Sequence, residues 1–328
     1  MLLVGDVGGT KTVLALVDPE RDIHKHLVVK LVQSADYPSM ESLLTQFIRS
    51  VDYPVEYLAL GVPGPVVDGC ATGTNLPWVV DQAELKTHFG FRAVCLLNDL
   101  EAIASAIPHL SADGITSLNA VPAKPGGSIA VVAPGTGMGE AYLAWNGERY
   151  LAYPSEGGHA NFGPDSPLEL ELAGYLWQRY HHVSNERVCS GRGLPNIYGF
   201  LKDKGLYTEP DWLAEVLAKS DDPTPIIVQE ATRGATASPL CRATLDLFIA
   251  ILGAEAGNLA LKVLATGGVY LGGGIPPRIV TELQSGAFMR AFCHKGRIAY
   301  VMETIPVHVI MDPHVALLGA ALRGVEMV

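Results

Sequence analysis

Short apolar runs separated by polar, glycine-containing turns fill the first third of the chain. Two such runs between Leu2 and Val17 flank the polar stretch Asp6–Lys11, a pattern that predicts a strand, a tight turn and a second strand. Apolar residues at helical spacing in Ser39–Ile48 predict a helix that crosses between strands. Further strands are expected at 27–32, 57–62 and 93–97. This alternation predicts an α/β fold with a mixed sheet.

The same succession begins again in the second part of the chain. An apolar run at Ser128–Ala133 is followed by a turn containing glycine and threonine, and then by a second apolar run at Gly139–Trp145. The recurrence predicts two related lobes, and a length of 328 residues fits two domains better than one. We expect the smaller lobe to span residues 1–110 plus 302–328, and the larger lobe to span 111–301.

Helix signals become frequent in the later part of the chain. Ser166 is expected to cap a helix because Pro167 and Glu169 stand at the positions that favour a helix start. The apolar stretch Leu245–Thr266 contains charged side chains, which indicates a buried helix and no membrane span. We expect Asp312-Pro313 to cap a last helix.

Composition narrows the classes of partner. The 34 acidic residues exceed the 23 Lys and Arg residues and leave a formal net charge of −11, which argues against nucleic acid and anionic membrane surfaces as partners. The five cysteines form no CxxC pair, so neither a disulfide framework nor a structural zinc site is indicated. The start of the sequence lacks the pattern of a signal peptide, and we expect a cytoplasmic protein.

Three glycine clusters at predicted strand ends carry the first chemical signal. Glycine lets backbone amides approach an anion closely, and threonine and lysine add donors. The first cluster is no Walker A loop, since a strand and not a helix is expected after it. Each cluster alone is common in ordinary turns, but three in one α/β chain favour nucleotide binding. The residues concerned are Gly8, Gly9, Thr10 and Lys11, then Gly135, Thr136 and Gly137, and finally Gly272, Gly273 and Gly274.

Asp99 is the candidate catalytic carboxylate. It follows an apolar strand and opens an apolar helix, whose N-terminus is expected to keep it ionised and able to accept a proton. The alternative from the residues alone is structural, because Asn98-Asp99 before an apolar helix is also a common capping pattern. Position alone does not decide between the two.

The motifs in this order resemble the actin-like ATPase superfamily, which includes hexokinases and heat-shock ATPases, and within it the bacterial-type glucokinase family. The resemblance covers nearly the whole chain. The carrying segments are GDVGGTKT (5–12), GVPGP (61–65), TNLPW (74–78), LND (97–99), APGTGMG (133–139), EGGH (156–159), SNERV (184–188) and LGGGIPPR (271–278).

The resemblance implies two actin-like, ribonuclease H-like lobes around a cleft that binds ATP and a hexose. It implies ATP-dependent phosphorylation of glucose at its 6-hydroxyl, with Asp99 as general base. Asp6 would face Mg²⁺ through water, and the glycine clusters would hold ATP, with Gly273 and Gly274 near adenosine. The hexose contacts would be Asn98, Asp99, Glu156, His159 and Glu186, with Asn75 close by.

Departures from the pattern leave alternatives open. The segment directly after His159, Ala160–Pro164, contains no cysteine, unlike the zinc-binding segment of the related ROK kinases, and Ala133 stands where glycine is more usual. A kinase of the same fold that acts on fructose, mannose or an amino sugar remains an alternative. A sugar-responsive regulator without catalysis and an actin-like assembly protein are further ones. We expect a homodimer, for which apolar helices late in the second lobe offer a surface.

Overall fold

The structure is a computed structural model that describes residues 1–72 and 77–328, and it divides the chain into two compact units. Unit 1 comprises Met1–Gly114, Asn146–Pro154 and Asp312–Val328, and unit 2 comprises Ile115–Trp145 and Ser155–Met311. These limits differ from the expected ones at residues 111–114 and 146–154, which fall in unit 1, and at 302–311, which falls in unit 2. Segment 302–311 contains β14 (Val307–Ile310), which pairs with a strand of unit 2 and therefore belongs there.

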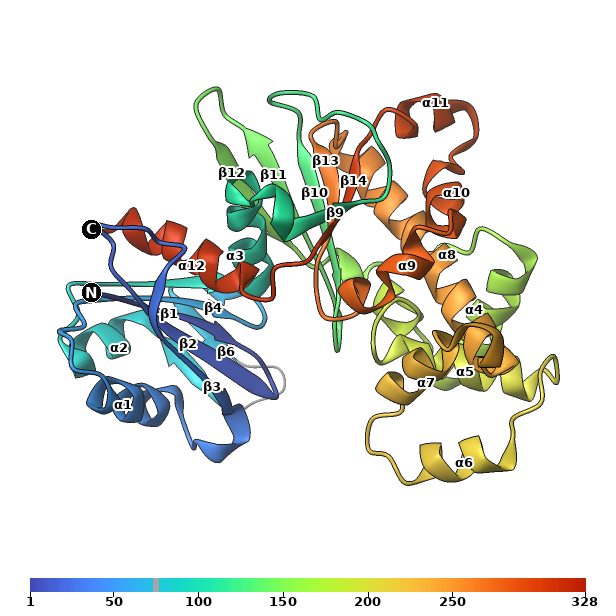
Figure 1. The fold of residues 1–328 in the computed structure, drawn as a ribbon, viewed down its shortest axis with the longest axis horizontal. Coiled ribbons are helices and arrows are strands. Elements are labelled where there is room, and N and C mark those ends of the chain that lie inside the picture. Colours follow the sequence, from blue (N-terminus) through green and yellow to red (C-terminus); the bar gives the residue numbers. More distant parts are fainter. Residues whose placement is uncertain (73–76) are drawn as a thin grey trace. The chain divides into compact units, whose positions relative to one another are not determined.

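Unit 1 is built on a five-stranded mixed sheet with the order β3-β2-β1-β4-β8 (Figure 1). Strands β1, β2 and β3 are antiparallel neighbours, whereas β1, β4 and β8 run parallel. The strands predicted from the apolar runs are confirmed. The sheet consists of β1 (Leu2–Val7), β2 (Lys11–Val17), β3 (His26–Gln33), β4 (Tyr57–Val62) and β8 (Ala93–Asn98).

Helices cover both faces of this sheet. Leu3 faces a core that includes Leu43 and Phe47 of α1, while Leu2 faces a second core that includes Leu317 of α12. Successive strand residues point to opposite faces, so one strand serves both cores. The helices are α1 (Met40–Ser50), α2 (Gln82–Phe89), α3 (Asp99–Ala106) and α12 (Val315–Val325), and a small separate sheet holds β5 (Val66–Val67), β6 (Cys70–Thr72) and β7 (Val79–Asp81).

A six-stranded sheet repeats this topology; five of its strands lie in unit 2, and the edge strand at 150–155 falls within unit 1 except for Ser155. Its order is β12-β11-β10-β13-β14-β9, with β10 antiparallel to β11 and parallel to β13, which is in turn parallel to β14. The predicted recurrence of strand, turn and strand therefore has a counterpart in the strand order. The remaining strands are β9 (Ile115–Ser117), β10 (Ile129–Pro134), β11 (Met138–Trp145), β12 (Tyr150–Ser155) and β13 (Gly268–Leu271).

The long helix α8 (Pro239–Val263) forms the centre of the helical layer of unit 2. Among the residues that the structure describes it is the one helix long and apolar enough to cross a bilayer, and most of its residues are buried in the protein core. It packs against α5, α7 and α10 (Figure 1). The other helices are α4 (Pro167–Tyr180), α5 (Gly193–Asp203), α6 (Asp211–Ala218), α7 (Thr224–Ala231), α9 (Val280–Leu283), α10 (Ala287–Cys293) and α11 (Ala299–Met302).

Two predicted helix starts have different outcomes. Ser166 caps α4 as expected, because its side chain accepts a hydrogen bond from the backbone N–H of Glu169. The predicted cap of the last helix is wrong in detail: α12 begins at Val315 with His314 as N-cap residue, and Asp312 Oδ1 accepts the backbone N–H of His314. Asp312 therefore forms the turn that precedes the helix.

The contact between α3 and α12 depends on a glycine. A Cβ atom added at Gly319 of α12 would overlap the carbonyl oxygen of Ala102 on α3. The two helix backbones touch directly at this point, and any side chain there must push them apart. Because Asp99 is the first residue of α3, this contact also fixes the position of the candidate catalytic carboxylate.

We expect Gly319→Ala to lower the free energy of unfolding by about 1–3 kcal/mol, because overpacking displaces α12 from α3. Gly174→Ala is the matched control. Gly174 lies on the exposed face of α4 with open space around its Cα, and alanine there should raise helix stability by about 0.5–1 kcal/mol. Thermal and urea unfolding of both variants measure the effect. A Gly319→Ala protein as stable as the wild type would contradict the close contact.

Candidate active site

In unit 1 the candidate residues gather where the parallel strands end. Asp6 lies near the end of β1 and pairs in register with Gly61 of β4, while Asn98 ends β8 beside Val62. Strand β4 separates β1 from β8, so the two strands are two spacings apart, roughly 10 Å between backbones. Asp6 and Asp99 therefore lie at the same edge of one sheet.

Asn98 has a structural role that the sequence left open. Its Oδ1 accepts the backbone N–H groups of Leu100 at 3.0 Å and Glu101 at 3.3 Å, so Asn98 is the N-cap of α3. Its Nδ2 donates to the carbonyl of Gly64 at 3.0 Å, which ties the helix start to the loop after β4. Asn98 is therefore the capping residue, and Asp99 is the first residue of the helix.

Asp99 is half-buried at the N-terminus of α3. Its Oδ1 accepts the backbone N–H of Leu100 at 2.9 Å, which orients the carboxylate at the start of the helix. The positive end of the helix dipole favours a negative charge at this place. Partial exposure leaves the carboxylate open to a ligand, as a proton acceptor requires.

The first glycine turn is bonded by Ser34, a residue that no sequence motif singled out. Ser34 Oγ donates to the carbonyl of Gly8 at 2.7 Å, and the backbone N–H of Ser34 donates to the carbonyl of Thr10 at 2.9 Å. The turn itself closes through a hydrogen bond from Gly8 N–H to the carbonyl of Lys11. The side chains of Thr10 and Lys11 are exposed at its tip, where an anion can reach them, and Gly9 lies between.

Asp6 sits deeper than the turn that follows it. Burial raises the pKa of its carboxyl group to about 6, and the nearby His314 partly opposes this rise. Mg²⁺ prefers carboxylate oxygens and retains several waters. The described residues contain no cluster of three or more His, Cys, Asp or Glu side chains that could hold a metal. One buried carboxylate therefore fits a Mg²⁺ that keeps water and phosphate as its other ligands.

In unit 2 the second glycine turn connects β10 to β11. The backbone N–H of Gly135 donates to the carbonyl of Gly137 at 2.8 Å, and the carbonyl of Gly135 accepts the N–H of Gly191 at 2.7 Å. Thr136 is exposed at the tip. This turn thus matches the first one in strand order and in its exposed threonine.

Glu186 touches the outgoing side of this turn. Its Oε2 accepts the backbone N–H of Met138 at 3.2 Å, and a Cβ atom at Gly137 would lie 2.5 Å from the same oxygen. Glycine at 137 is therefore required for Glu186 to approach the turn. The residue predicted to bind sugar and the turn predicted to bind phosphate are in direct contact.

Glu156 is the N-cap residue of a short 3₁₀ turn, Gly157–His159, that ends at His159, and both side chains are exposed. The ring Nε2 of His159 lies 3.8 Å from Glu156 Oε2. The carbonyl of Ala160, just after this turn, accepts the N–H of Asn185 at 2.9 Å. That bond links the turn to Glu186, so the structure brings Glu156, His159 and Glu186 into one connected segment.

The third glycine cluster follows β13 and packs behind the second turn. Gly273 has a φ of +78°, and a Cβ atom there would lie 2.6 Å from the carbonyl oxygen of Pro134. Gly272 N–H donates to the carbonyl of Val132. Gly274 continues the same loop. Both the left-handed φ and the close approach require glycine at 273.

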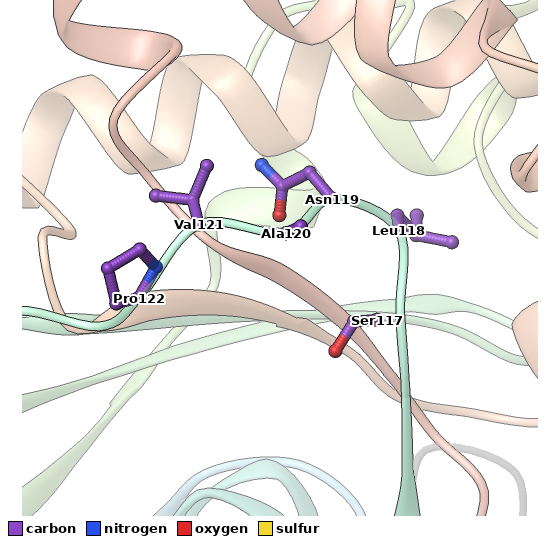
Figure 2. Close-up of a pocket in the computed structure, with 6 residues that line it drawn as sticks. All are labelled: Ser117, Leu118, Asn119, Ala120, Val121 and Pro122. Carbon is purple, nitrogen blue, oxygen red and sulfur yellow. The ribbon is translucent and has the colours of Figure 1, made fainter.

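Asn75 lies outside the described residues. A hollow of about 630 Å³, lined by Ser117–Pro122 after β9, contains none of the predicted residues (Figure 2). The side chain of Asn119, which lines this hollow, bonds the carbonyl of Ile305 and the N–H of Val307, each at 2.9 Å. These bonds attach the loop to the sheet, so the polar side chain of Asn119 has a structural role.

Comparisons with known proteins agree with the motifs. The family model described as Glucokinase matches residues 3–327. A glucokinase of Trichormus variabilis is 38% identical over 342 residues, covering 100% of this chain and 99% of that protein. The crystal structure of a glucokinase from an Antarctic psychrotroph is 30% identical, with a TM-score of 0.82 and 98% of each chain covered.

A glucokinase from Balamuthia mandrillaris, solved in complex with glucose, has a TM-score of 0.80 at 23% identity, with 98% of this chain and 93% of that chain covered; this likeness concerns the fold. The predicted α/β class with actin-like lobes is confirmed by these neighbours. A match along nearly the whole sequence, at this identity and coverage, decides the family. The chain belongs to the glucokinase family.

Proposed function

We propose that this protein transfers the γ-phosphoryl group of ATP to the 6-hydroxyl of glucose, which yields glucose 6-phosphate and ADP. The observation that carries the assignment is Asp99, a half-buried carboxylate fixed at the start of α3 within a chain of the glucokinase family. The sugar O6–P bond forms as the bond between phosphorus and the ADP oxygen breaks. Asp99 accepts the proton of the 6-hydroxyl.

The other predicted residues bind and orient the substrates. Carboxylates and amides suit a pyranose because each can bond two neighbouring hydroxyls. Asn98 contributes an amide whose Oδ1 and one N–H are already engaged, so its position is fixed before sugar binds. Glu156, His159 and Glu186 act from unit 2, and Asn75 completes the proposed set.

The glycine turns bind the nucleotide in this proposal. Backbone N–H groups and the exposed hydroxyls of Thr10 and Thr136 bond phosphate oxygens, with Lys11 as an additional cation and Gly273-Gly274 against adenosine. Asp6 would hold Mg²⁺ through water. When bound, that ion neutralises negative charge on the phosphates.

Asp99→Asn tests the general base. The amide keeps the size and the Oδ1 acceptor of the side chain but takes up no proton, so we expect kcat to fall by a factor of about 10²–10⁴ while the Kd of glucose changes little. Asp81→Asn, the same change at the N-cap of α2, is the matched control and should leave kcat unchanged. Turnover by Asp99→Asn close to the wild-type rate would remove Asp99 from this role.

Sugar specificity is tested by measuring ADP release with glucose, fructose, mannose and glucosamine. Glucose should give the highest kcat/KM, and one missing or inverted hydroxyl contact should lower it at least about tenfold. A higher kcat/KM for another hexose would replace glucose as the substrate. Sugar binding without any ADP release would favour a regulator.

We also propose a cytoplasmic homodimer. All five cysteines are free thiols, which suits a reducing compartment. Ile298 and Tyr300, late in unit 2, are exposed apolar residues of the kind that a subunit contact covers. Sedimentation velocity should show a dimer that Tyr300→Glu dissociates. A monomer at all protein concentrations would contradict this.

A further inference from the structure

Two buried carboxyl groups lie behind the Glu156–His159 turn. Glu140 on β11 is 1% exposed and Glu255 on α8 is 4% exposed. A Cβ atom at Gly157 would overlap Glu140 Oε2, so the carboxyl group of Glu140 lies directly against the backbone of the turn. Glu140 therefore has α8 on one side and the turn on the other.

The surroundings of the two carboxyl groups are unequal. Glu255 Oε2 accepts a hydrogen bond from Asn258 Nδ2 at 2.9 Å, and Lys262 Nζ lies 3.7 Å from Glu255 Oε1. Neither oxygen of Glu140 has a hydrogen-bond partner among the described residues. An ionised carboxylate without partners is costly to bury. The negative charge is therefore best placed on Glu255 and the proton on Glu140.

The electrostatics of the site agree with this geometry. Burial and the nearby Glu255 carboxylate raise the pKa of Glu140 to about 8, and Lys262 opposes the rise. The thiol of Cys189 is fully buried, and both carboxylates contribute to raising its pKa. Glu156 and His159 face solvent on the turn itself. Besides Lys262, the cation of Lys295 interacts electrostatically with Glu255, and its Nζ donates to the carbonyl of Ala254 at 3.0 Å.

From this packing we propose that Glu140 is a positioning residue for sugar binding: its protonated carboxyl group supports the Glu156–His159 turn, and loss of that proton displaces the turn. Ionised Glu140 repels Glu255, and Lys262 offsets this repulsion only in part. The exposed turn is the side that can move. Gly158 of the same turn packs on the carbonyl of Met138, so displacement also disturbs the segment that contacts Glu186. This inference rests on the proposed binding of glucose by these residues.

The test is calorimetric titration of the full-length protein with glucose between about pH 7 and about pH 9. One pH unit above the pKa of Glu140, only about a tenth of the molecules carry the proton that supports the turn. The Kd of glucose should therefore rise about tenfold in wild type. Glu140→Gln cannot ionise and should give a flat profile. Glu255→Gln lowers the pKa of Glu140 by removing the repulsion, so its rise should begin at lower pH.

Glu215→Gln, an exposed change on α6, is the control and should keep the wild-type profile. A Kd that rises equally in wild type and Glu140→Gln would overturn the inference, as would a flat wild-type profile. Infrared difference spectra supply a readout that needs no sugar. The carbonyl band of a protonated carboxyl group should vanish above about pH 8 in wild type and be missing in Glu140→Gln.

Failure of the proposed function remains distinguishable. A wild-type protein that binds no glucose but loses the infrared band on alkalinisation would overturn the sugar assignment and support the proton on Glu140. A protein that binds and phosphorylates glucose but shows no such band would overturn the role of Glu140 alone.

Discussion

Direct contact between backbones at glycine is the constraint on which both units depend. In unit 1, α12 reaches α3 only because Gly319 leaves the carbonyl of Ala102 uncovered. In unit 2, Gly158 lies on the carbonyl of Met138 and Gly273 on that of Pro134. A methyl group at any of these places forces whole elements apart, since packed interiors deform little. The candidate residues are carried by the elements that these contacts position.

This constraint explains why unit 2 contains a buried carboxyl group that no local rule favours. Gly157 has no side chain, and the space beside it is filled from behind by Glu140. An apolar side chain of similar size would fill the same space at lower electrostatic cost. A protonated carboxyl group differs from it in one respect, because its contact with the turn depends on a proton. A role for that proton in supporting the turn would explain why a carboxyl group, and not an apolar side chain, stands at position 140.

Local signals in the sequence were sufficient for the strands, the three glycine turns and the Ser166 cap, since each is set by neighbouring residues. They were insufficient for contacts between distant segments. No local pattern distinguishes Ser34, which bonds the first turn, or Glu255, which lies beside Glu140. Both contacts join segments that are distant in the sequence. The expected boundary at 302 differs from the division into units for the same reason, because pairing with β13 assigns β14 to unit 2. The motif order supplied the candidate site residues; their partners required coordinates.

Asp6 and Asp99 lie at one sheet edge, and their surroundings suit the two different tasks proposed for them. Burial raises the pKa of Asp6 to about 6, so its ionised form is held only weakly and gains from a nearby cation. Asp99 is half-buried at a helix N-terminus, where the backbone N–H of Leu100 donates to its carboxylate and the helix dipole favours a negative charge. A proton acceptor must be ionised and must also be held still. The position of Asp99 is fixed by α3, of which it is the first residue. Because α3 packs against α12 at Gly319, the last helix of the chain also positions the proposed base.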